Sequence, residues 1–185
     1  MFRLFTLTLT FLLTIRAKMT VIGIDPGIDR VGVGIIEQSN NKYNLLFQQL
    51  IHTDKSLTTP QRLVGIYEQL QEILSNWKQI EAASVEKLFF CKNVTNAITV
   101  AQARGVICLA LCQAGIPIFE YTPMQIKQAL TGYGRGTKQQ VQELVRMLLG
   151  LKELPTKNDD VADGMAMAIT HINTARSMRK INPQF

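Results

Sequence analysis

Residues 20–37 read TVIGIDPGIDRVGVGIIE, and this stretch decides the fold of the chain. Thr20 to Asp25 predicts a buried strand, and Pro26-Gly27 forces a turn directly after it. Val31 to Glu37 is apolar and rich in β-branched residues, which predicts a second strand. The first strand therefore ends on a carboxylate beside a tight turn, where burial without a partner is costly.

The rest of the chain predicts a third strand and then an alternation of helices and strands. Asn40-Asn41 favours a hairpin turn before the third strand. Apolar residues at the helical period, with proline or glycine at the ends, define the later segments. Strands are expected at 43–53, 82–89 and 117–121, and helices at 59–78, 93–113, 123–130, 138–149 and 160–176. This order predicts an α/β fold with a mixed five-stranded sheet flanked by helices.

The composition favours a single folded domain with an anionic partner. The chain has 185 residues, of which 46% are hydrophobic, and its formal net charge is +6. A basic domain of this kind suits nucleic acid, although a mildly basic protein without any polyanion has the same composition. Cys91, Cys108 and Cys112 form neither an even set nor a CxxC pair. This predicts buried free thiols in a reducing compartment, here the cytoplasm.

The first 18 residues are predicted to lie outside the folded domain. The apolar run from Leu4 to Ile15 is too short to span a bilayer, and basic residues follow it where a signal peptide would carry small ones. We interpret the segment as the product of an upstream start codon, with Met19 as the natural first residue; an organellar targeting segment is the alternative. The predicted division is an extension at 1–18, a domain at 19–176 and a tail at 177–185, with no membrane segment.

Four carboxylates stand where strands end and where the last helix begins. Asp25 ends the first strand, and Glu86 lies near the end of the strand at 82–89. Asp160 and Asp163 are three apart and share a face of the last helix. Taken singly, such residues suit a turn, an exposed strand end or a helix cap. Together they can converge at one edge of the sheet, where Mg²⁺ or Mn²⁺ would relieve their mutual repulsion.

Several motifs together resemble the RuvC family of Holliday-junction resolvases. The matching segments are Ile24-Asp25-Pro26-Gly27, Glu86 followed by Phe89, Gln102-Ala103-Arg104-Gly105-Val106, and Asp160-Val161-Ala162-Asp163 through Ala168-Ile169-Thr170-His171. The resemblance implies an RNase H-like fold and a homodimer that makes paired, symmetric, metal-dependent nicks in a four-way DNA junction. It also implies a branch-migration motor, RuvA and RuvB, as a partner in recombination and repair.

The resemblance further implies the roles of individual carboxylates. Asp25, Glu86, Asp160 and Asp163 are the expected catalytic and metal-binding residues. The expected cofactor is Mg²⁺, with two ions in each subunit and Mn²⁺ as a substitute. Asp159 is a rival for the place of Asp160, because some members of the family carry histidine at that place.

Four other residues are expected to bind DNA. By resemblance, Lys127 and Lys138 lie near the scissile phosphate; ordinary solvated lysines are the alternative. Arg135 lies in a glycine-rich loop at 132–137, which is expected to be flexible and to follow a phosphate backbone, or else to be a plain linker. Phe89 is expected to stack on bases that are unpaired at the junction centre.

The helix expected at 93–113 is apolar on more than one face, which predicts a place for it in the homodimer interface. Gly105 inside this helix indicates close packing, either on the sheet or on a second subunit. Ala103 and Ile107 are expected on the outward face, where a charge would disrupt the dimer.

Three other functions fit part of the sequence. Another RNase H-like nuclease, such as one that cuts RNA–DNA hybrids, would use the same carboxylates. An actin-like ATPase also begins with a strand, Asp-x-Gly and a hairpin, but it needs two lobes and leaves Asp160 and Asp163 unexplained. A non-catalytic junction-binding module would not need four carboxylates, which repel DNA unless metal is present.

Overall fold

A mixed five-stranded sheet forms the centre of the molecule. The computed structural model describes residues 18–88, 94–154 and 159–181, and its strands lie in the order β3-β2-β1-β4-β5. β1 pairs antiparallel with β2, β2 pairs antiparallel with β3, and β4 and β5 run parallel to β1. The strands are β1 Lys18–Asp25, β2 Arg30–Ser39, β3 Lys42–His52, β4 Ala82–Glu86 and β5 Ile118–Tyr121. The mixed sheet predicted from the sequence is confirmed.

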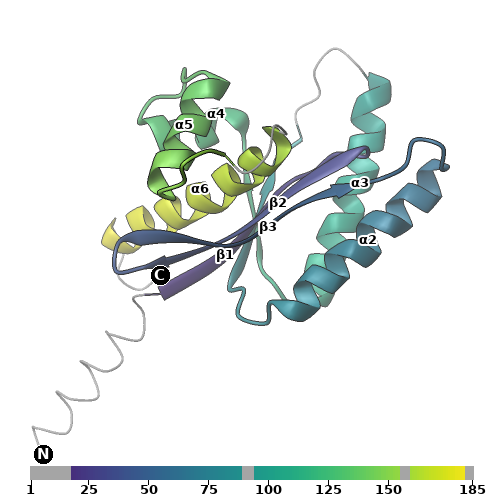
Figure 1. Cartoon of the computed structure of the whole chain (residues 1–185), viewed down its shortest axis with the longest axis horizontal. Helices are drawn as coiled ribbons and strands as arrows, with labels where there is room; N and C mark the ends of the chain where they lie inside the picture. Colours follow the sequence, from purple (N-terminus) through teal and green to yellow (C-terminus); the bar gives the residue numbers. More distant parts are fainter. Residues whose placement is uncertain (1–17, 89–93, 155–158, 182–185) are drawn as a thin grey trace, which may run out of the picture.

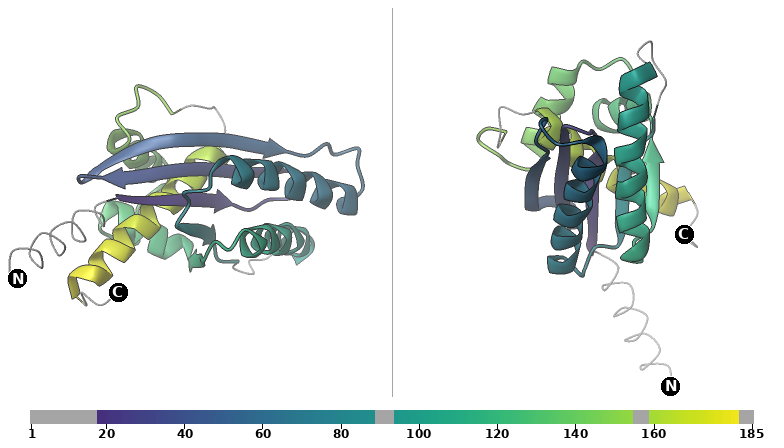
Figure 2. Two further views of the ribbon diagram at one scale, coloured as in Figure 1. Left: turned by 90° about the horizontal axis from the view of Figure 1, so that it is seen from below. Right: turned by 90° about the vertical axis from the view of Figure 1, so that its right-hand side faces the viewer.

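Helices cover both faces of this sheet (Figures 1 and 2). One face packs against α2 and α3, and the other packs against α6, which α4 and α5 adjoin. The helices are α2 Thr59–Asn76, α3 Val94–Gln113, α4 Pro123–Thr131, α5 Lys138–Leu148 and α6 Asp159–Ile181. No helix in the described part of the chain is long and apolar enough to cross a membrane.

The pleat of the strands decides which side chains face α6. Ile22 and Ile24 of β1 belong to the core on the side of α2 and α3, whereas Val21 belongs to the core on the side of α6. Successive side chains of a strand point to opposite faces, so Asp25 shares the face of Val21. The same alternation in β4 places Glu86 on the face of Ala82, which also packs on the side of α6.

Glycines bring α6 into direct contact with the sheet. A Cβ atom on Gly32 would lie 1.8 Å from the carbonyl oxygen of Asp160, and one on Gly23 would lie 2.0 Å from the carbonyl oxygen of Gly164. Any side chain at these two strand positions would therefore push the helix away. The close contact fixes the first turns of α6 against the ends of β1 and β2.

The loop between α4 and α5 makes specific contacts with the ends of these helices. Gly132 ends α4 in the left-handed region with φ 78°, and Thr137 caps α5 by accepting a hydrogen bond from the Gln140 amide. A Cβ on Gly136 would lie 2.8 Å from Cγ2 of Thr131, and one on Gly134 would meet α4 in the same way. These two glycines therefore allow close packing of the loop, and its expected flexibility stays a prediction.

Several segment ends differ from the prediction. β4 ends at Glu86, earlier than the strand expected at 82–89. α6 continues to Ile181, past the expected end of the domain at residue 176. β1 begins at Lys18, inside the expected extension, because the ladder with β2 continues to the pair of Lys18 and Ser39.

Candidate active site

Three elements bring four carboxylates to one edge of the sheet. β1 and β4 are parallel neighbours with Ile24 opposite Val85, so Asp25 and Glu86 end adjacent strands at the same edge. Asp160 and Asp163 reach this edge from the first turns of α6. All four side chains line one pocket of about 350 Å³.

Burial and mutual repulsion disfavour ionisation of this cluster. Burial, together with the charges of the other three carboxylates, raises the pKa of Asp25 to about 8. Burial is also the largest cause that raises the pKa of Glu86 and of Asp163. A hydrogen bond between Asp25 and Glu86 lowers the pKa of Glu86 while it raises that of Asp25, which places the shared proton on Asp25. Burial away from water disfavours the charged form of a carboxylate in this way.

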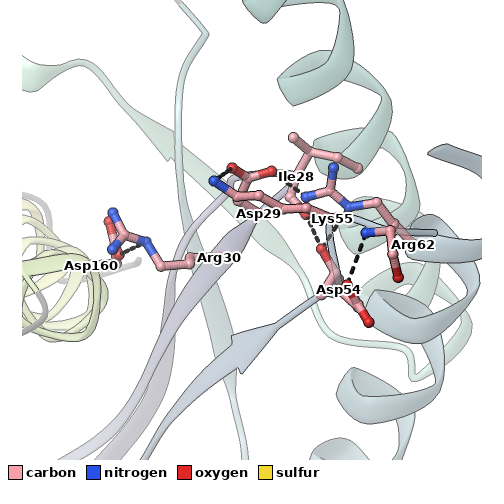
Figure 3. A network of polar contacts seen from close by, with 9 residues as sticks. Ile28, Asp29, Arg30, Asp54, Lys55, Arg62 and Asp160 are labelled. Atoms are coloured by element: carbon pink, nitrogen blue, oxygen red, sulfur yellow. Dashed lines mark hydrogen bonds and ion pairs between the residues drawn. The ribbon is translucent and has the colours of Figure 1, made fainter. Parts of the chain in front are cut away.

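Two basic residues pair with the carboxylates of α6. Nε of Arg30 lies 2.8 Å from Oδ2 of Asp160 (Figure 3). Nζ of Lys138 lies 2.7 Å from Oδ2 of Asp163 and 3.4 Å from Oδ2 of Asp159. Burial lowers the pKa of Lys138, but its contacts with Asp163 and Asp159 outweigh burial and raise the pKa overall.

Asp159 occupies a different environment from Asp160. Asp160 lines the pocket and its side chain is 21% exposed, whereas the Asp159 side chain is 60% exposed. A hydrogen bond from Gln142 and the charge of Lys138 lower the pKa of Asp159. Of the two candidates, Asp160 therefore has the environment of a pocket ligand.

The donor set of the pocket suits a divalent cation with oxygen ligands, such as Mg²⁺ or Mn²⁺. Four carboxylates, three of them with a raised pKa, fit such an ion, because it would relieve the repulsion between them. Among the residues that the structure describes, no group of three or more His, Cys, Asp or Glu side chains is arranged closely enough to hold a metal ion. Asp160 is engaged with Arg30 and Asp163 with Lys138, so an ion would have to draw these carboxylates away from their basic partners.

The chain matches the family model described as "Crossover junction endodeoxyribonuclease RuvC" over residues 21–171. The chain belongs to the RuvC family. A relative of that name from Petrotoga mobilis is 49% identical over 161 residues, which are 87% of this chain and 98% of the relative. Another, from Brevibacillus brevis, is 52% identical over 153 residues, which are 83% and 91% of the two chains.

A solved structure extends this agreement to the fold. The structure of T. thermophilus RuvC in complex with Holliday junction substrate matches with a TM-score of 0.81 and 37% sequence identity, covering 86% of this chain and 96% of that chain. The RNase H-like fold and the family that the motifs indicated are therefore confirmed.

The expected DNA-binding residues of this RuvC chain fall in different places. Lys127 of α4 and Lys138 of α5 both line the carboxylate pocket. Arg135 is exposed in the loop between these two helices. Phe89 lies outside the described residues. The structure thus places two of the four basic or aromatic candidates at the acidic pocket itself.

Sequence reasoning missed several residues that shape this RuvC site. Arg30 was not singled out, because a lone arginine after a turn carries no pattern. Arg104 lies in a quoted motif, but only the structure shows that its Nε donates a hydrogen bond to the Glu86 carbonyl oxygen at 3.2 Å and that it pairs with Glu120. The glycines at 23 and 32 were visible as breaks in apolar strands, which is the available signal for close approach of another element.

The predicted outward face of α3 was wrong. Ala103 and Ile107 are completely buried in the core that α3 forms with α2 and the sheet. The helix is apolar all round, so its hydrophobic pattern could not distinguish the two faces. Gly105 is exposed and has open space around its Cβ position, and Cys112 is also exposed rather than buried.

Proposed function

We propose that this protein is a metal-dependent endonuclease that resolves four-way (Holliday) DNA junctions by paired, symmetric nicks in recombination and repair. The observation that carries the proposal is the meeting of Asp25, Glu86, Asp160 and Asp163 in one pocket of a RuvC chain. Lys127 and Lys138 line the same pocket. The pocket therefore combines carboxylates that can bind a cation with ammonium groups that can bind a phosphate.

The carboxylates are proposed to hold Mg²⁺, with Mn²⁺ as a substitute and two ions in each subunit. Asp25 and Glu86 approach from the sheet, and Asp160 and Asp163 approach from α6. When bound, such ions activate the attacking water and stabilise the charge on the leaving oxygen. The rigid contact of α6 with β1 and β2 keeps the two halves of this ligand set at a fixed separation.

The basic residues of the pocket are proposed to orient the phosphodiester. Lys138 already pairs with Asp163, and its raised pKa keeps it protonated at neutral pH. Lys127 lies on α4 and lines the same pocket as the sheet carboxylates. Two ammonium groups on one side of the scissile phosphate would counter the repulsion between the DNA and the acidic cluster. Arg135 is proposed to contact the phosphate backbone of the junction, and Phe89 is proposed to stack on its unpaired bases.

Paired nicks require two active sites, and we propose that a homodimer supplies them. The described part of the chain shows one carboxylate pocket of this kind, whereas a four-way junction has an approximate twofold axis. The exposed face of α3 offers an apolar surface for the second copy: Ile98 and Leu109 are each 52% exposed, with Gln102 and Gly105 between them. A branch-migration motor of the RuvA and RuvB type and a location in the cytoplasm complete the proposal.

A direct comparison of substrates tests this function against another RNase H-like nuclease. A synthetic four-way junction, a linear duplex and an RNA–DNA hybrid of equal length would be incubated with the protein and Mg²⁺. The proposal predicts cleavage of the junction alone at low protein concentration. Preferential cleavage of the hybrid would replace the proposal with the alternative nuclease, and binding of the junction without cleavage would favour the non-catalytic module.

A further inference from the structure

The turn between β1 and β2 sends two neighbouring charged side chains in opposite directions (Figure 3). Asp29 points toward α2, where its carboxylate pairs with Arg62 and lies 3.3 Å from Nζ of Lys55. Arg30 points toward α6, where it meets Asp160. A single dipeptide thus links the helix on one face of the sheet to a proposed ligand on the other face.

The main chain of this turn is clamped. The Thr53 amide donates a hydrogen bond to the Asp29 carbonyl oxygen at 3.1 Å, and the Thr53 hydroxyl donates one to the Ile28 carbonyl oxygen at 2.6 Å. Nε of Arg62 donates to the same hydroxyl at 2.9 Å. Arg30 itself begins β2 and pairs with β3. Its backbone is therefore fixed, and its side chain is the part that can change partner.

Arg30 meets Asp160 through one edge of its guanidinium, and only the arginine side of this contact is exposed. The ion pair runs through Nε at 2.8 Å; the Arg30 side chain is 51% exposed, whereas the Asp160 side chain is 21% exposed and its Oδ2 atom is buried. This Oδ2 atom makes no hydrogen bond that compensates its burial, so a divalent cation can compete with the half-exposed guanidinium for the carboxylate. A guanidinium that loses a carboxylate retains a planar set of donors that matches a phosphate. Since Asp160 lines the pocket, the released group would stand beside the place where a substrate phosphate arrives.

We propose that Arg30 is a positioning residue that exchanges Asp160 for a DNA phosphate when a divalent cation binds the carboxylates. In the cation-free protein it holds Asp160 by the buried Oδ2 atom and competes with the ion. In the cation-bound protein, Arg30 contacts the DNA phosphate and raises the affinity for the junction. Cation and junction therefore bind cooperatively through Arg30, and by thermodynamic linkage each raises the affinity of the other by the same factor. This inference rests on the proposed function.

The first test titrates Mn²⁺ into the protein without DNA, with calorimetry as the readout. Arg30→Gln removes the competing charge at similar length, so it should bind Mn²⁺ about threefold tighter than the unaltered protein, in line with the loss of one partly exposed ion pair. Lys55→Gln is the matched control, because it removes one positive charge from the same turn network on the side away from the pocket. Unchanged or weaker Mn²⁺ binding by Arg30→Gln would overturn the competition.

The second test measures junction affinity with and without Ca²⁺, a cation that takes oxygen ligands. The ratio of the two dissociation constants is the coupling factor, and couplings between sites are typically on the order of 5- to 150-fold. Arg30→Gln should reduce this factor at least about threefold, Arg30→Lys should retain part of it, and Lys55→Gln should leave it unchanged.

The two tests separate failure of this inference from failure of the proposed function. If the unaltered protein binds both cation and junction but Arg30→Gln keeps the full coupling factor, the exchange is wrong and the function stands. An equal loss of coupling in Lys55→Gln would also overturn the exchange, because the loss of any positive charge near the turn would then explain the reduced coupling. If the unaltered protein binds neither ligand, the proposed function fails and the exchange fails with it.

Discussion

Asp25 and Asp29 lie four residues apart and stand in opposite electrostatic environments. Burial and neighbouring carboxylates raise the pKa of Asp25, whereas a hydrogen bond from Arg62 and the charge of Lys55 lower the pKa of Asp29. The Asp29 carboxylate is satisfied by the protein alone, and the Asp25 carboxylate is not. A buried carboxylate whose charge is poorly compensated, such as Asp25, costs stability, and carboxylates of this kind are typical of functional sites.

The largest expected difference between the two aspartates is in catalysis. Asp25→Asn preserves the shape of the side chain and removes its charge, so it should reduce junction cleavage on the order of 10³-fold, the scale of losing one group that stabilises a transition state. Glu86→Gln and Asp163→Asn should behave alike. Junction binding should persist, since repulsion of the phosphates falls. Cleavage rates at saturating Mg²⁺ and gel-shift affinities measure the two effects.

Asp29→Asn is the matched control for this comparison. It makes the same chemical change in the same turn, but its partners are structural, so cleavage should stay within about twofold of the unaltered rate, as for most surface substitutions. Equal loss of cleavage in both variants would break the contrast and would indicate that the turn as a whole, rather than the carboxylate cluster, supports the activity.

A smaller difference is expected in stability, and metal should reveal it. A cation that binds only the folded protein stabilises it by about 2.7 kcal/mol at 100 times its dissociation constant. Millimolar Mg²⁺ or Mn²⁺ should therefore raise the melting temperature of the unaltered protein and of Asp29→Asn. The rise should shrink in Asp25→Asn, which lacks a ligand charge. An equal rise in all three proteins would place the stabilising ion away from Asp25.

A charge placed on the exposed face of α3 should disrupt the dimer and leave the carboxylate pocket of each subunit intact. Leu109→Glu should fold normally, because this side chain is half exposed, but it should shift the protein from dimer to monomer in light scattering. The first nick should persist and the second should become slow. Met147→Glu, at an exposed apolar site on α5, is the control. A dimeric Leu109→Glu protein would show that another surface forms the interface.

The smallest effect concerns the pH dependence of stability at Asp29. Its pKa is lowered in the folded protein, so its contribution to stability is present above the unfolded pKa of about 3.9 and is lost as the pH falls through the folded pKa. The free energy of unfolding of the unaltered protein should exceed that of Asp29→Asn by less than about 1 kcal/mol at pH 7. Urea titrations should show this gap closing below pH 4; a gap that widens there would contradict the assigned ion pair.

The sequence was sufficient to predict the sheet and the elements that carry the four carboxylates. Asp25 and Glu86 end two apolar strands, and Asp160 and Asp163 mark a helix start. The partners of these carboxylates could not be predicted, because Arg30 reaches Asp160 only through the contact of α6 with Gly32. The glycine at position 32 signals close approach of another element, but local pattern does not identify α6 as that element.

The faces of α3 show a second limit of the sequence. Ala103 and Ile107 are no more hydrophobic than Ile98 and Leu109, yet the first pair is buried and the second is exposed. The position of α2 beside α3 decides which side is covered, and that position follows from packing on the sheet.

The central claim is that one metal-dependent carboxylate pocket in each of two subunits cuts a four-way junction at related positions. Mapping of cut sites on a junction with each of its four strands labelled in turn tests this claim most directly, with and without Mg²⁺. The account predicts two cuts at symmetric positions in opposed strands, only with Mg²⁺, and none with Asp25→Asn. Cleavage without a divalent cation, or cuts at unrelated positions in adjacent strands, would contradict it.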